Sequence, residues 1–155
     1  MRILAMAATA LLAAIVGCGS EAGPTDPDIT GITFAPSLNV DLAQMTKTSQ
    51  GVYFRDLLAG SGGVVQGSSR IRAHYRGWLP SGSEFDANQP PAIPLEVTLG
   101  QGALIAGWEI GVPGMKVGGT RQLVIPPSLG YGSAGQGPIP PNSYLVFTVN
   151  MVSIQ

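Results

Sequence analysis

The stretch from residue 70 to residue 79 constrains the fold of this chain more than any other feature. Its side chains alternate between two kinds, one apolar or small and the other mostly basic. The first set is Ile71, Ala73, Tyr75, Gly77 and Leu79, and the second is Arg70, Arg72, His74, Arg76 and Trp78. Successive side chains of a strand point to opposite faces of a sheet, so this pattern predicts a strand with one buried and one solvated face.

Shorter stretches of similar character surround this strand. They are rich in β-branched and aromatic residues and are separated by glycine- and proline-containing turns, which is typical of antiparallel strands. The predicted strands are residues 52–58, 84–86, 94–99, 120–126 and 144–154.

Residues 104–112 follow a different pattern, in which Ile105, Trp108 and Val112 are spaced to form one apolar face of a short helix. Two glycines in this stretch lower its helix propensity, so the helix must be stabilised by packing. The predicted fold class is therefore α+β, with an antiparallel sheet of about five strands and one short helix covering one face.

Composition excludes several classes of protein. With 45% hydrophobic residues the chain is expected to fold, and its 22 Gly and 13 Pro indicate many turns. A net charge of −1 provides no basic surface for nucleic acid. A single cysteine and a single histidine exclude an internal disulfide and a His/Cys metal site. We find no nucleophile–base pattern, no paired carboxylates and no phosphate loop, and we expect no cofactor or metal.

The N-terminal residues have the pattern of a signal peptide. Arg2 precedes an apolar run from Ile3 to Val16, which is shorter than the roughly 20 residues needed to span a bilayer. The run ends at Gly17-Cys18 and resembles a bacterial lipobox, which implies cleavage after residue 17 and acylation of Cys18. The alternative is an ordinary secretory signal with an incidental cysteine. More than one acyl chain gives stable membrane anchoring.

We divide the chain into a signal peptide (1–17), a segment with the lipidated cysteine, a flexible tether and a lead-in (18–47), and a folded domain (48–155). The tether is rich in Gly, Ser, Pro and acidic residues up to about Gly31. Residues 32–46 mix apolar and polar positions, and an edge strand is one interpretation of them.

Four separated motifs in the predicted domain resemble one known family. Residues 74–86 contain HYRGWL, then Gly, then Phe-Asp, and residues 104–111 read LIAGWEIG. Residues 125–142 contain IPP, YG and IPPN in that order, and residues 145–147 read LVF. Their order and spacing resemble the FKBP-type peptidyl-prolyl cis–trans isomerases over residues 48–155.

The resemblance implies a bent antiparallel sheet wrapped around the helix, with a hydrophobic pocket between them. By position in the motifs, the implied catalytic residues are Tyr75, Phe85, Asp86 and Tyr131. The implied substrate-binding residues are Leu95, Leu104, Ile105, Trp108, Ile139 and Phe147. The chain departs from many members after Asp86, where it has Pro90-Pro91 and then Leu95 in place of a basic and an aromatic residue.

The resemblance further implies an enzyme that accelerates rotation about X–Pro bonds in unfolded or nascent polypeptides, and a pocket open to macrolide immunosuppressants. With the lipobox it implies an extracytoplasmic protein, attached to the bacterial cell envelope by its lipid anchor, that assists secreted or envelope proteins. One alternative is an FKBP-like chaperone or binding module with little or no turnover, which the altered surroundings of Asp86 keep open. Another is a structural lipoprotein without a functional pocket.

Overall fold

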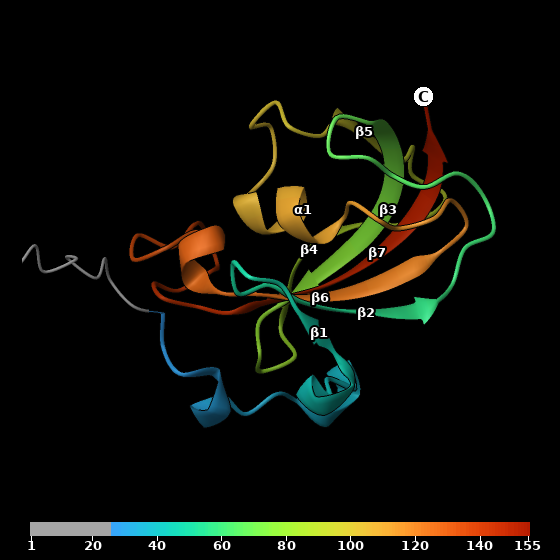
Figure 1. Cartoon of the computed structure of the whole chain (residues 1–155). Coiled ribbons are helices and arrows are strands. Elements are labelled where there is room, and N and C mark those ends of the chain that lie inside the picture. The colour runs from blue at the N-terminus through green and yellow to red at the C-terminus, as the bar shows by residue number, and fades with distance from the viewer. Residues whose placement is uncertain (1–25) are drawn as a thin grey trace, which may run out of the picture.

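The computed structural model describes residues 26–155 (Figure 1). The predicted signal peptide and the predicted lipidation site, Cys18, lie outside these residues. None of the helices formed by residues 26–155 has the length and hydropathy needed to cross a membrane.

The domain is built on one sheet of seven strands that curves around a short helix (Figure 1). The strands are β1 (Thr46–Lys47), β2 (Tyr53–Leu58), β3 (Arg70–Trp78), β4 (Glu84–Asn88), β5 (Leu95–Thr98), β6 (Thr120–Ile125) and β7 (Leu145–Ile154). Every pairing is antiparallel, and the order is β1-β2-β6-β7-β3-β4, with β5 also paired to β3. The predicted α+β fold is confirmed.

The number of strands exceeds the expected five or so for two reasons. Strand β1 has only two residues, which is too short to show a periodic pattern. Strands β4 and β5 pair with different parts of β3, β4 with residues 75–78 and β5 with residues 70–73. The two short strands therefore occupy successive stretches of β3.

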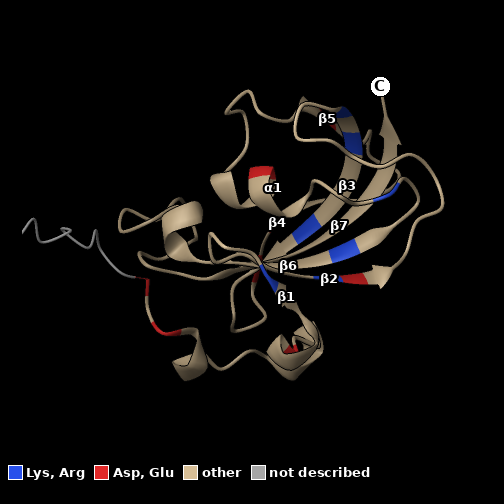
Figure 2. Ribbon diagram, viewed as in Figure 1, with Lys and Arg blue, Asp and Glu red and all other residues tan. Residues whose placement is uncertain are grey.

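Strand β3 has the two faces that its alternation predicts. Ile71, Ala73 and Gly77 are buried, whereas Arg70 and Arg76 are exposed. A register shift between residues 72 and 73 interrupts its pairing with β7. We call the face of the sheet that packs on the helix the inner face, and the opposite face, to which the β3 arginines belong by their alternation, the outer face. Figure 2 marks the basic positions along β3.

Helix α1 (Ala106–Gly111) is shorter than the predicted 104–112, because Ile105 is its extended N-cap residue. Trp108 and Val112 are buried in the core between the helix and the sheet. The largest fully buried side chains of the domain are mainly aliphatic and include Ile71, Leu99, Met115, Leu123, Ile125, Leu145 and Met151.

The glycines of α1 allow it to lie unusually close to β6. A Cβ atom on Gly107 would lie 2.3 Å from Cγ2 of Ile125, and one on Gly111 would lie 2.8 Å from Cδ2 of Leu123. Both distances are well below van der Waals contact. The residues that weaken the helix intrinsically are thus the ones that let it pack on the sheet.

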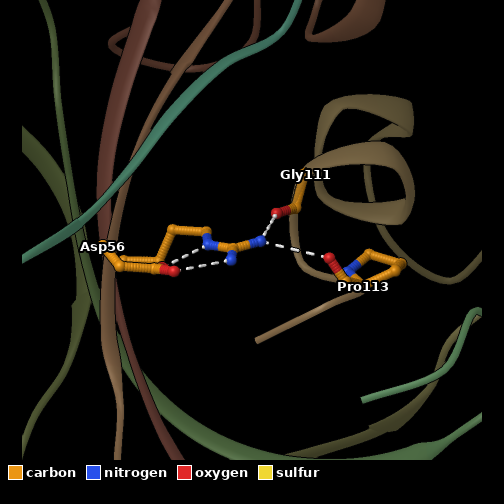
Figure 3. Close-up of polar contacts among 4 residues, drawn as sticks. Asp56, Gly111 and Pro113 are labelled. Atoms are coloured by element: carbon orange, nitrogen blue, oxygen red, sulfur yellow. Dashed lines mark hydrogen bonds and ion pairs between the residues drawn. The ribbon is translucent and has the colours of Figure 1, made fainter. Parts of the chain in front are cut away.

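Arg121 links β2, β6 and the end of α1 (Figure 3). Its side chain is buried and donates to both carboxylate oxygens of Asp56, at 2.6 and 3.0 Å. Nη1 of the same guanidinium donates to the carbonyl oxygens of Gly111 and Pro113, at 2.9 and 3.1 Å. All three guanidinium nitrogens of Arg121 therefore donate hydrogen bonds. A charged group can be buried at tolerable cost only when it is paired and hydrogen-bonded in this way.

Residues 26–45, which we call the N-terminal strap, lie on the outer face of the sheet (Figure 1). Three short 3₁₀ turns form part of it: Ile29–Gly31, Pro36–Leu38 and Leu42–Gln44. Ile29 and Leu38 are buried in a second apolar cluster with Val124, Tyr144 and Val146 of the sheet end.

Polar contacts also hold the strap. Asp26 accepts hydrogen bonds from the backbone N–H and the hydroxyl of Ser128, at 2.8 and 2.6 Å, and the Tyr144 hydroxyl donates to the carbonyl oxygen of Pro27 at 2.8 Å. The sequence suggested a flexible tether up to about Gly31. The described part of that segment, residues 26–31, instead lies against the domain, because Ile29 finds apolar partners on the outer face.

The close approach of α1 to β6 generates a stability prediction. Gly107→Ala should lower the free energy of unfolding by about 1–2 kcal/mol, because overpacking outweighs the roughly 1 kcal/mol gained in helix propensity. Gly67→Ala is the matched control, since a Cβ there meets nothing within 4 Å. It should change stability by less than about 0.5 kcal/mol. Urea unfolding measures both, and equal effects would contradict the close-packing explanation.

Candidate active site

A cavity of about 320 Å³ lies between the inner face of the sheet and the start of α1. Its lining is mainly apolar and aromatic, with one carboxylate at the margin. The lining residues are Tyr75, Asp86, Leu95, Gly102, Ala103, Leu104, Ile105, Trp108, Tyr131 and Phe147. A concave, mostly apolar site with a few polar groups is typical of small-ligand and peptide side-chain pockets.

The sheet brings distant parts of the chain to one wall of this cavity. Gly77 of β3 lies opposite Phe147 of β7 on one side and Asp86 of β4 on the other. Gly77 has no side chain to separate its neighbours, and a Cβ there would lie 2.7 Å from Phe147 and 2.8 Å from Phe85. Glycine at this strand position therefore lets the aromatic rings of neighbouring strands meet.

The aromatic rings hold one another in edge-to-face geometry. Trp108 lies 5.4 Å from Tyr75 and 5.6 Å from Phe147 between ring centroids, with interplanar angles of 88° and 86°. Phe85 meets Phe147 at 5.5 Å and 86°. Such pairs contribute roughly 0.5–1.5 kcal/mol each beyond burial, so these contacts stabilise the arrangement of rings in the cavity floor.

Two tyrosine hydroxyls and one carboxylate supply the polar groups. The Tyr75 hydroxyl donates to Oδ2 of Asp86 at 2.8 Å. Burial raises the pKa of Tyr75 to about 12, with a further contribution from this hydrogen bond. Burial, together with the negative charge of Asp86, also raises the pKa of Tyr131. Both phenols are therefore neutral donors at physiological pH.

The hydroxyls differ in what they bind. That of Tyr75 is engaged by Asp86, whereas that of Tyr131 makes no hydrogen bond to any residue in the 26–155 part of the chain. Tyr131 follows the 3₁₀ turn Pro127–Leu129. Its hydroxyl is thus available to a bound molecule.

Eight of the ten residues proposed from the sequence line the cavity: Tyr75, Asp86, Leu95, Leu104, Ile105, Trp108, Tyr131 and Phe147. Phe85 and Ile139 do not. Phe85 is half-buried and packs edge-to-face on the lining residue Phe147, and Ile139 is a core residue with 5% of its surface exposed. Both belong to the apolar core that also contains Trp108 and Phe147.

The sequence did not single out Gly102 and Ala103, which also line the cavity. They precede α1, and glycine and alanine contribute too little apolar side chain for hydrophobic periodicity to give a signal. Gly77 was placed on the apolar face, but its role in admitting the aromatic rings was missed. A glycine inside an otherwise regular strand is the signal that could have indicated such a close approach.

The segment after Asp86, where the chain departs from many family members, is fixed by amide side chains. Nε2 of Gln89 donates to the carbonyl oxygen of Tyr75 at 2.8 Å. Nδ2 of Asn88 donates to the carbonyl oxygen of Ile93 at 3.0 Å, and its Oδ1 lies 2.8 Å from Nδ1 of His74. Leu95 then reaches the cavity wall. In this chain Asp86 is supported by the Tyr75 hydroxyl.

Comparison with known proteins agrees with this geometry. A family model described as FKBP-type peptidyl-prolyl cis-trans isomerase matches residues 62–152. The FK506-binding protein 4 of Chaetomium thermophilum is 45% identical over 120 residues, which is 77% of this chain but 23% of the fungal protein. The chain thus spans about a quarter of that relative's length.

A shorter relative is matched over nearly its whole length. The FK506-binding protein of Neisseria meningitidis serogroup B is 42% identical over 105 residues, which is 67% of this chain and 96% of that protein. The crystal structure of FkpA from Escherichia coli is similar with a TM-score of 0.66 and 37% identity, over 72% of this chain and 52% of that one.

The family indicated by the sequence motifs is confirmed by the match across most of the domain and by the curated relatives. The chain belongs to the FKBP-type peptidyl-prolyl cis-trans isomerase family, whose members catalyse rotation about the peptide bond that precedes proline.

Proposed function

We propose that the cavity accelerates X–Pro rotation by binding the amide in its twisted form. Rotation faces a barrier of about 18–20 kcal/mol because the planar amide loses resonance as it twists. The twisted amide has less charge separation than the planar one. An apolar site that excludes water therefore favours it over the ground state, which lowers the barrier. The observation that carries this proposal is the apolar aromatic lining of the cavity, with its rings packed edge-to-face.

Each side chain has a proposed role in substrate binding that follows from its position in the cavity. Trp108 provides the floor for the pyrrolidine ring, and Leu104 and Ile105 contact it from the start of α1. The unengaged Tyr131 hydroxyl donates to a substrate carbonyl. Tyr75 and Asp86 form the polar side of the mouth, and Phe85 keeps Phe147 in place. The same cavity is proposed to admit macrolide immunosuppressants, which compete with a proline-containing segment.

We further propose that the protein acts outside the cytoplasm, attached to the bacterial envelope through acylated Cys18. The support is the sequence pattern of residues 1–18, which joins a signal-like apolar run to a lone cysteine at its end. Clients are then secreted or envelope polypeptides that contain proline and have not yet folded.

The first functional prediction concerns turnover. The purified protein should accelerate cis–trans exchange in a short X–Pro peptide, and Tyr131→Phe should lower kcat/KM about fivefold, as expected for one lost hydrogen bond of roughly 1 kcal/mol. Tyr53→Phe is the matched control, because Tyr53 packs with the outer cluster, away from the cavity. It should leave the rate unchanged. Exchange is measured by magnetisation-transfer NMR on the peptide.

Two outcomes of this assay would contradict the proposal in different ways. A folded protein with no acceleration would favour a binding module that grips proline-containing segments without turnover. Normal turnover in Tyr131→Phe would leave the activity intact but remove the role assigned to its hydroxyl.

The second prediction concerns pH. Because the pKa of Tyr75 is raised to about 12, its hydroxyl stays protonated and bonded to Asp86 throughout the neutral range. The stability that this neutral phenol contributes is fully present below pH 10 and is lost as pH rises through about 12. The rate should therefore be flat from pH 6 to 9. An alkaline loss centred below about pH 10 that disappears in Tyr75→Phe would be incompatible with this.

The third prediction concerns the anchor. In a bacterial host, the wild-type protein should take up a labelled fatty-acid analogue and partition with membranes. Cys18→Ser should abolish both and keep isomerase activity, because the cavity is built from residues 75–147. A wild-type protein that takes up no label and is released after cleavage at another position would replace the lipoprotein with an ordinary secreted isomerase.

A further inference from the structure

A second cavity, of about 400 Å³, lies on the outer face of the sheet. One side is formed by residues 37–39 of the N-terminal strap, and its floor by side chains of β2, β6, β7 and β3. It shares no lining residue with the candidate active site. Nothing in the proposed isomerase mechanism uses it.

The floor of this cavity is a continuous row of side chains across four strands. Arg55 of β2 lies opposite Gln122 of β6, Gln122 opposite Thr148 of β7, and Thr148 opposite Arg76 of β3. Neighbouring strands are about 4.8 Å apart, so the two arginines are separated by roughly 14 Å along the row. The cavity is therefore elongated, with a cationic residue at each end.

The two arginines differ in how their charges are balanced. Arg76 forms an ion pair with Glu84 at 2.6 Å and lies 5.2 Å from the centre of the Trp78 ring. Arg55 donates from Nη2 to neutral acceptors, the carbonyl oxygen of Asn39 at 2.8 Å and Oε1 of Gln122 at 3.2 Å.

No carboxylate of residues 26–155 forms an ion pair with Arg55. Its neighbour Asp56 points to the other face and binds Arg121. The Arg55 end of the row therefore has a positive charge that no described residue neutralises, and its Nη1 makes no hydrogen bond within that part of the chain.

Apolar surface and open hydroxyls adjoin this charge. Leu57 lies two positions along β2, on the same face as Arg55, and 48% of its surface is exposed although it lines the cavity. The hydroxyl of Thr148, in the middle of the row, forms no hydrogen bond with another side chain or backbone group of residues 26–155. A ligand that fits has an anionic group, an adjacent apolar group and an extended shape.

We propose that this cavity binds a short extended polypeptide segment in which an acidic side chain stands two positions from an apolar one, so that both point to the same side of the segment. The carboxylate accepts from Nη1 of Arg55, the apolar side chain two positions away covers Leu57, and Thr148 bonds to the backbone of the segment. An extended chain advances about 3.3 Å per residue, so a row of roughly 14 Å accommodates about four residues. A single small carboxylate would fill only the Arg55 end.

The test uses the full chain and a blocked peptide, acetyl-Leu-Ala-Glu-amide, with no proline and no free carboxylate at its end. The peptide should cause saturable shifts of the backbone amide signals of Gln122 and Thr148, and none at Trp108 or Tyr131. Acetyl-Leu-Ala-Gln-amide, in which a neutral amide replaces the carboxylate, should bind at least tenfold more weakly. Added salt should weaken binding of the acidic peptide, because the contact is charged and partly exposed.

Substitutions of Arg55 and Thr148 test whether the peptide binds in this cavity. Arg55→Gln should weaken binding of the acidic peptide at least tenfold and leave isomerase activity unchanged, whereas Arg55→Lys keeps the charge and should retain most of the affinity. Because Arg55 also holds the strap through Asn39, Thr148→Val is a second variant that leaves the strap contacts intact. It should weaken binding severalfold.

Three results would overturn the proposal. The first is the absence of shifts at Gln122 and Thr148 at millimolar peptide. The second is equal affinity for the glutamate and glutamine peptides. The third is sodium acetate reproducing the full set of shifts at the same concentration, which would make the cavity a site for small oxyanions only.

Discussion

The close contact between helix α1 and strand β6 determines the geometry of the candidate active site. A helix of six residues is too short to be stable alone, so its place depends on tertiary contacts. Gly107 and Gly111 let it lie directly on Ile125 and Leu123, and Arg121 bonds the carbonyl oxygens at its end. Because Trp108 is part of this helix, the same contacts set the depth of the cavity.

The two faces of the sheet differ in the character of their surfaces. The inner face and α1 enclose an apolar cavity suited to a proline ring, whereas the outer face is apolar under the strap and cationic beside it. The strap also reaches the active-site side, because Asp26 binds Ser128 in the turn that precedes Tyr131. One end of the segment that would join the domain to its proposed anchor is therefore fixed next to the loop that bears a proposed catalytic hydroxyl.

Local patterns predicted most of the framework. The alternation along β3 gave its two faces correctly, and the i, i+3, i+7 spacing located the helix to within two residues at its start. The family resemblance supplied the residues around the cavity, most of which the structure brings together. The resemblance did not separate the residues that line the cavity from Phe85 and Ile139, which do not line it. All of them belong to the same motifs.

The sequence by itself determined six of the seven strands and the helix, and its motifs determined the aromatic set, since side-chain period and motif spacing are properties of neighbouring residues. Only the tertiary structure decided that residues 26–31 pack against the domain, that Arg121 is buried, and that Arg55 stays without an anionic partner among the described residues. These outcomes depend on contacts between distant positions, such as Tyr144 with Pro27, 117 residues apart, or Arg121 with Asp56, 65 residues apart. Burying a polar side chain, or a segment with few apolar residues, is favourable only where a hydrogen-bonding or apolar partner is present. No local sequence pattern shows where that partner lies.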